Sequence, residues 1–85
     1  MSYSELKKFL ENYQSDVRID KGKAQRALDV TWTTFKRWIK GCEDLNESQE
    51  GRHKLIDGAA LVRHLAKRDM THWSGLLHEY IENSK

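Results

Sequence analysis

The chain has 85 residues, of which 38% are apolar and 33% are charged, and its formal net charge is +2. This length predicts one domain over residues 1–85 with a modest core, and this composition is typical of a folded protein rich in helix. No apolar run approaches the roughly 20 residues of a membrane span, and no apolar stretch of a signal peptide follows Met1, so we expect a cytoplasmic protein without a membrane partner.

The first twenty residues predict a helix and a short strand. Ser2 and Glu5 have the spacing of a capping box, which often begins a helix. Residues 17–19 are alternating and β-branched, a pattern that indicates a short strand. The helix is expected over residues 3–14, with an apolar face that consists of Leu6, Phe9, Leu10 and Tyr13.

The next segment predicts two short helices joined by a turn. Asp20 is a good N-cap for a helix over residues 21–28, and Thr31 is a good N-cap for a helix over residues 32–39. Gly41 is expected to end the second helix with a positive φ. The apolar faces hold Ala24, Ala27 and Leu28 in the first helix and Phe35, Trp38 and Ile39 in the second.

The second half predicts a hairpin followed by two helices. Residues 42–51 are polar and end in a glycine, so we expect a loop or hairpin tip, and residues 52–56 have the pattern of a strand. Asp57 is expected to cap a helix that runs to about residue 68, and Thr71 is expected to cap the last one. An apolar stripe then follows at helical spacing, formed by Trp73, Leu76, Leu77, Tyr80 and Ile81.

The charge is distributed unevenly along the chain. Residues 21–41 carry six cations against one acidic residue, a net charge of +5, and residues 52–70 carry five against two, a net charge of +3. Between these blocks, residues 42–51 carry four acidic residues and no cation. A local basic block favours binding to a polyanion, although the solvated face of a helical pair has the same composition.

The stretch from Leu28 to Gly41 resembles the helix-turn-helix of excisionases and MerR-type regulators. In that family a Leu-Gly-Val turn precedes hydroxyl residues, a buried apolar residue, an Arg-aromatic pair, a basic residue and a glycine. Those places are held here by Leu28-Asp29-Val30, then Thr31, Thr33 and Thr34, then Phe35, Arg37-Trp38 and Lys40-Gly41. Residues 51–57, followed by Leu61 and Leu65, resemble the second wing strand and the helix behind it.

The resemblance covers residues 22–68 and implies a mainly α, winged helix-turn-helix fold with a small β-hairpin wing. Its parts would be a helix-turn-helix over residues 21–41, a wing over 42–56 and C-terminal helices over 57–83. It further implies a sequence-specific protein that binds double-stranded DNA, such as a small transcriptional repressor or an excisionase-like regulator of a phage or plasmid.

The chain departs from the family pattern at one residue and in one segment. Asp29 stands where the family has a glycine, but aspartate tolerates the left-handed conformation better than most residues. The acidic segment 43–50 lies where the family has a basic wing, so we expect it to point away from DNA or to contact another protein.

A recognition helix buries one face and offers the other to the major groove. Arg37 is expected to pair with guanine, Lys36 and Lys40 to hold phosphates, and threonines to meet base edges or phosphates. Trp32 is open to two interpretations, contact with DNA or packing on the first helix, and His53 is either a phosphate contact or a plain surface residue. The predicted DNA-binding residues are Lys21, Lys23, Thr31, Trp32, Thr33, Lys36, Arg37, Lys40, Arg52, His53 and Lys54.

The C-terminal stripe could pack inside its own domain or against a second copy of the chain. A short chain with so apolar a terminal helix favours a homodimer, in which Trp73, Leu76, Leu77, Tyr80 and Ile81 would form the contact. The alternative to DNA binding is a protein-binding adaptor on the same scaffold that does not bind DNA. Its working surfaces would be the acidic loop 43–50 and the C-terminal stripe.

Enzymatic, metal and cofactor chemistry have little support in the sequence. Cys42 is the one cysteine, so no internal disulfide can form, and the four histidines lack the spacing of a metal site. No nucleophile elbow, P-loop or calcium-loop pattern occurs. We therefore expect a protein that is not an enzyme and that has neither a cofactor nor a metal.

Overall fold

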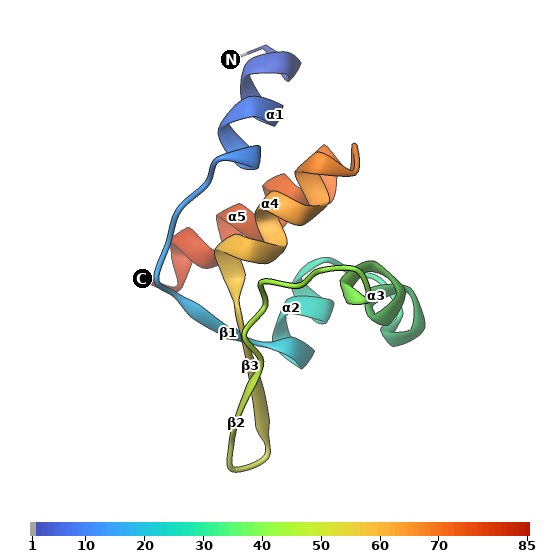
Figure 1. Ribbon diagram of the computed structural model, residues 1–85, viewed down its shortest axis with the longest axis vertical. Coiled ribbons are helices and arrows are strands. Elements are labelled where there is room, and N and C mark those ends of the chain that lie inside the picture. The colour runs from blue at the N-terminus through green and yellow to red at the C-terminus, as the bar shows by residue number, and fades with distance from the viewer. Residues whose placement is uncertain (1) are drawn as a thin grey trace.

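The computed structural model describes residues 2–85 as five helices and one three-stranded antiparallel sheet (Figure 1). The helices are α1 (Tyr3–Glu11), α2 (Lys21–Ala27), α3 (Trp32–Ile39), α4 (Gly58–Lys67) and α5 (Thr71–Asn83). The strands are β1 (Arg18–Asp20), β2 (Ser48–Glu50) and β3 (His53–Asp57). The order of elements is the one expected from the sequence, and none of these helices is long and apolar enough to cross a bilayer.

Four of the five helices begin at a side-chain cap. The side chains of Ser2, Asp20, Thr31 and Asp57 each accept a hydrogen bond from a backbone amide in the first turn of their helix, as predicted. The prediction for the last helix is wrong. Met70 occupies the N-cap position of α5 without a side-chain hydrogen bond, and Thr71 is instead buried, where its hydroxyl accepts from the Tyr3 hydroxyl at 3.1 Å.

The sheet places β3 between β1 and β2. Ile19 of β1 pairs with Ile56 of β3, and both side chains are buried, whereas every residue of β2 is exposed. Gly51 turns the β2–β3 hairpin with a φ of 60°, a conformation that glycine adopts without strain. In Figure 1 this hairpin extends away from the helices.

The hydrophobic core is centred on α4. Seven of its ten residues are buried, and α1 and α5 pack against it. The Ser74 hydroxyl of α5, fully buried, donates to the Val62 carbonyl of α4 at 2.7 Å, which joins the two helices. The Lys7 ammonium of α1 forms an ion pair with Asp69 at the α4–α5 turn, and this contact helps to fix α1 on the pair.

Three local predictions need correction. The first helix ends at Glu11 rather than at residue 14, and the Asn12 side-chain amide donates to the Lys8 carbonyl at 2.9 Å, which provides an alternative to another helical turn. Phe9 is 44% exposed, although its spacing predicted a buried face. Gly41 has no positive φ, because α3 ends in a tight turn in which the Cys42 amide donates to the Ile39 carbonyl.

Candidate nucleic-acid interface

The turn between α2 and α3 determines how α3 is presented. Asp29 has a φ of 55°, the left-handed conformation expected where the resembling family has glycine. The Leu28 side chain before it is buried in the core, and the Gln25 side-chain amide donates to the Val30 carbonyl across the turn. The two helices are therefore joined by a defined turn that is anchored at both sides.

One face of α3 is attached to the protein and the other is open to solvent. Phe35 is the one fully buried residue of the helix, and Trp38 and Ile39 are half-buried against the core. The Trp38 ring lies edge-on to Trp73 of α5, with the ring centroids 5.1 Å apart. The opposite face exposes the side chains of Trp32, Thr33, Lys36, Arg37 and Lys40.

Two hollows adjoin along this exposed side of α3. The first has a volume of about 700 Å³ and is lined by Lys21, Trp32, Thr33, Lys36, Arg37, Ile39, Lys40 and Lys54. The second has a volume of about 410 Å³ and is lined by Asp20, Lys21, Gly22, Lys23, Arg26, Trp32, Arg52, His53 and Lys54. Because both include Lys21, Trp32 and Lys54, they form one continuous surface, called here the basic face.

The basic face brings together residues from separate parts of the chain. Ten of the eleven predicted DNA-binding residues line it; they come from α2, α3, the hairpin turn and β3. Arg26 also lines it and was missed by the sequence analysis. Its position one helical turn after Lys23 places the two side chains on the same side of α2, and this spacing is the signal that could have identified it.

Thr31 is the predicted residue that lines neither hollow. Its hydroxyl accepts from the Thr34 amide at 3.2 Å and lies 3.0 Å from the Thr34 hydroxyl. It therefore serves as the cap of α3. Thr33, by contrast, lines the first hollow with an exposed side chain.

Trp32 lies at the junction of the two hollows. Its ring is stacked on Phe35 with a centroid separation of 5.7 Å, and 44% of its surface remains exposed. Neither of the two hollows that Trp32 lines includes a residue of α1. Trp32 instead presents an aromatic surface within the basic face.

Two basic residues of the basic face, Lys21 and His53, already contact carboxylates. The Lys21 ammonium lies 2.6 Å from a Glu47 carboxylate oxygen and 5.8 Å from the centroid of the Trp32 ring, and its side chain is only 15% exposed. The ion pair lowers the pKa of Glu47 from its ordinary value of 4.5. Lys21 is thus less available to an external anion than its position at the start of α2 suggested.

The second pair joins the hairpin to α2. The His53 Nδ1 atom lies 2.9 Å from an Asp20 carboxylate oxygen, while the other oxygen of Asp20 accepts from the Lys23 amide at 2.9 Å. The hydrogen bond from the Lys23 amide is the main reason that the pKa of Asp20 lies below its ordinary value of 3.8. The contact with His53 lowers this pKa further. Asp20 therefore ends β1, caps α2 and contacts β3.

The remaining cations are free of such partners. Within residues 2–85, these side chains form no ion pair: Lys23, Arg26, Lys36, Arg37, Lys40, Arg52 and Lys54. All of them are exposed. They concentrate uncompensated positive charge on one side of a chain whose net charge is only +2.

The acidic segment does not point away from this surface as a whole. Leu45 is buried, and its carbonyl accepts from the Asp57 amide at 2.7 Å, so the segment is fixed to the end of β3. Glu47 contacts Lys21 and therefore lies beside the basic face. Glu43, Asp44 and Glu50 are exposed.

The C-terminal stripe divides into two sets of side chains. Leu77 and Ile81 are fully buried within the chain itself, so a second copy cannot reach them while the fold is intact. Trp73, Leu76 and Tyr80 are half-buried and pack against the same core. A contact with another chain through this stripe would therefore use the exposed parts of those three.

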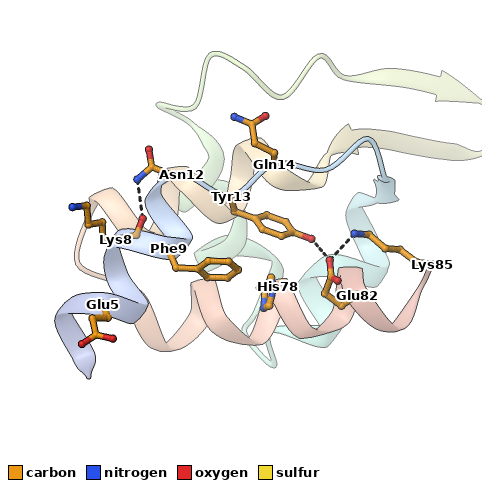
Figure 2. Close-up of a pocket in the computed structure, with 9 residues that line it drawn as sticks. All are labelled: Glu5, Lys8, Phe9, Asn12, Tyr13, Gln14, His78, Glu82 and Lys85. Atoms are coloured by element: carbon orange, nitrogen blue, oxygen red, sulfur yellow. Dashed lines mark hydrogen bonds and ion pairs between the residues drawn. The ribbon is translucent and has the colours of Figure 1, made fainter. Parts of the chain in front are cut away.

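A third hollow of about 680 Å³ lies between α1 and α5 (Figure 2). The His78 ring forms T-shaped contacts with Phe9 and Tyr13. The Tyr13 hydroxyl donates to Glu82, which also pairs with Lys85 at 2.8 Å. Burial, followed by the bond to Glu82, raises the pKa of Tyr13. These contacts hold α1 against α5. The hollow that remains is a shallow surface of mixed charge.

Among residues 2–85, no three His, Cys, Asp or Glu side chains come together in a group that could hold a metal ion. Burial raises the pKa of the half-buried Cys42 thiol, which keeps it in its less reactive protonated form. No family model, no curated protein and no solved structure matches this chain.

Proposed function

We propose that this chain binds double-stranded DNA with a preference for sequence, as a winged helix-turn-helix protein whose α3 enters the major groove. The observation that carries the proposal is the basic face, where unpaired cations surround the exposed side of one helix. Phosphate contacts by lysine and arginine supply most of the affinity of a DNA-binding protein. A helix with one free face is the element that fits the major groove.

The topology supports the same proposal. The helix-turn-helix α2–α3 lies between strand β1 and the β2–β3 hairpin, and β1 pairs with β3. This arrangement fixes the base of the hairpin beside α2, with Lys54 lining both hollows. The hairpin is therefore suited to contact the DNA backbone next to the groove that α3 occupies.

The exposed residues of α3 would have separate roles. Arg37 would read a base, because its guanidinium can donate two parallel hydrogen bonds to guanine. Lys36 and Lys40 flank it and would contact phosphates, as would Lys23, Arg52 and Lys54 at the other end of the basic face. Thr33 and Trp32 would meet base edges or the sugar-phosphate backbone.

The proposed biological role is that of a small transcriptional repressor or an excisionase-like regulator of a phage or plasmid, and it rests on the resemblance of residues 22–68. A homodimer on two half-sites would fit this role, with the exposed parts of Trp73, Leu76 and Tyr80 as its contact. The proposal includes no catalytic step, cofactor or metal.

The experiment that tests the proposal is selection from a pool of random duplex DNA at about 50 and 200 mM salt, followed by sequencing. We expect enrichment of one motif, as an inverted repeat if the protein is dimeric. Affinity should fall by about a thousandfold between the two salt concentrations if about six phosphates are contacted. Absence of binding at the lower salt concentration would contradict the proposal and favour a protein-binding adaptor.

A further inference from the structure

Glu47 places a negative charge on the surface that is proposed to bind a polyanion. Its carboxylate contacts Lys21, a residue shared by both hollows of the basic face. The Lys21 side chain is 15% exposed and the Glu47 side chain is 45% exposed, so the pair lies at the surface with its carboxylate open to solvent. A carboxylate in this place opposes the binding of any phosphate group near the start of α2.

The backbone around Glu47 holds the carboxylate in place. Leu45, two residues before it, is buried in the core. The Arg18 guanidinium of β1 donates to the Asn46 carbonyl, to the Ser48 hydroxyl at 3.1 Å and to the Leu55 carbonyl at 3.2 Å. Glu47 is thus fixed on both sides, and its position over Lys21 follows from the fold of the segment.

Glu47 differs in this respect from the other acidic residues of the segment. Within residues 2–85, neither Glu43, Asp44 nor Glu50 forms an ion pair. Their charges act on DNA only through the general field, which salt screens over about 10 Å at 0.1 M. Glu47 acts at contact distance on one cation of the basic face.

We propose that Glu47 limits the affinity of the basic face for DNA by occupying the Lys21 ammonium, which a phosphate group would otherwise contact. The inference rests on the proposed function and adds an internal competitor to it. Lys21 cannot contact Glu47 and a phosphate equally well, so the ion pair must open before this cation joins the interface. The segment that departs from the resembling family thereby sets how tightly the protein holds DNA.

The test compares Glu47→Gln with Glu43→Gln, which removes the same charge from the same segment without touching an ion pair. Binding of the full chain to a random-sequence duplex is measured between about 50 and 200 mM salt. Glu47→Gln should tighten binding by about two- to fivefold at the lower concentration, the range expected for opening an ion pair at the protein surface. The slope of log affinity against log salt should steepen by about 0.9, because one more phosphate is contacted.

A second pair of variants tests the same proposal by changing the lysines instead of the acidic residues. Lys21→Met in the wild-type background should reduce the salt slope by less than Lys23→Met does, because Glu47 already occupies the Lys21 ammonium. Lys23→Met should reduce the slope by about 0.9, because Lys23 has no such partner. Adding Lys21→Met to Glu47→Gln should abolish the steeper slope.

The outcomes separate the two proposals. Equal slopes for Glu47→Gln and Glu43→Gln, or slope reductions of equal size for Lys21→Met and Lys23→Met, would overturn the role of Glu47 while DNA binding stands. Absence of DNA binding by the wild-type chain at about 50 mM salt would overturn the proposed function, and this inference with it. Urea denaturation of each variant verifies that it is folded under the binding conditions.

Discussion

Helices α3 and α4 are both short and amphipathic, yet the protein holds them in opposite ways. Seven of the ten residues of α4 are buried, whereas Phe35 alone is buried among the eight residues of α3. Helix α4 is enclosed by α1 and α5, and α3 is attached along one edge by Phe35, Trp38 and Ile39.

The contrast means that most of the stability and the proposed binding surface reside in different parts of the chain. Apolar area removed from water is the main favourable term in folding, and α4 contributes far more of it than α3. Substitutions on the exposed side of α3 should therefore change binding at little cost in stability. Substitutions around α4 should do the reverse.

The largest effect is expected in stability, at the buried residue that attaches α3 to the core. Phe35→Ala removes the one fully buried side chain of that helix, and we expect a loss of about 3–5 kcal/mol in the free energy of unfolding. Urea denaturation measures it. Lys36→Ala, the exposed neighbour, should change stability by no more than about 0.5 kcal/mol. A loss below about 1 kcal/mol for Phe35→Ala would mean that other contacts hold α3.

The next largest effect is expected in DNA affinity and not in stability. Arg37→Ala should lower affinity for the selected DNA site by about 10- to 100-fold, because a two-bond contact with guanine is lost, and should lower affinity for random DNA much less. Lys36→Ala should weaken both and reduce the salt slope by about one. Fluorescence anisotropy with both DNAs measures these values. An equal loss on selected and random DNA would show that Arg37 does not read a base.

A smaller effect is expected at Asp20, which caps α2. Asp20→Ala should lower the free energy of unfolding by about 1 kcal/mol at pH 7, because the Lys23 amide loses its acceptor. The pKa of Asp20 is depressed in the folded state, so its contribution is present above the ordinary value of 3.8 and is lost as the pH falls through the lower folded value. The difference in the free energy of unfolding between the variant and the wild type should therefore become smaller below about pH 3.8. A gap that stays constant down to pH 2 would contradict this assignment.

The smallest effect is a gain in stability from a substitution in α5, outside the basic face. A methyl group at Gly75 in α5 would meet no atom within 4 Å, so Gly75→Ala should raise stability by about 0.5–1 kcal/mol. The matched change Gly58→Ala would place its new carbon 2.7 Å from Ile81 Cδ1 and should be destabilising. Thermal unfolding of the two variants should shift in opposite directions, and DNA affinity of the folded Gly75→Ala variant should be unchanged.

The sequence predicted the features that depend on neighbouring residues. A cap needs one side chain and an amide two or three positions later, which is why Ser2, Asp20, Thr31 and Asp57 could be assigned. The basic residues of α3 were likewise assigned to one side from helical spacing alone. Their exposure follows because the opposite side supplies Phe35 to the core.

The features that sequence analysis missed depend on residues far apart in the chain. Thr71 has the character of a cap but is buried by α1, 68 positions away, through its bond to Tyr3. Strand β2 is polar throughout and has no alternating pattern, so it exists only because β3 lies beside it. Glu47 reaches Lys21 because Arg18 and the buried Leu45 position its backbone, and no local signal encodes that.

The pairing of β1 with β3 also bears on how the protein forms during its synthesis. Because Ile19 pairs with Ile56, helices α2 and α3 lie within a loop that closes only when β3 is in place. Closure of such a long loop loses entropy before its contacts form, so it should come late in folding and slow it. A nascent chain that has not yet reached β3 has no partner for β1. We therefore expect the basic face to assemble only after the ribosome has synthesised β3.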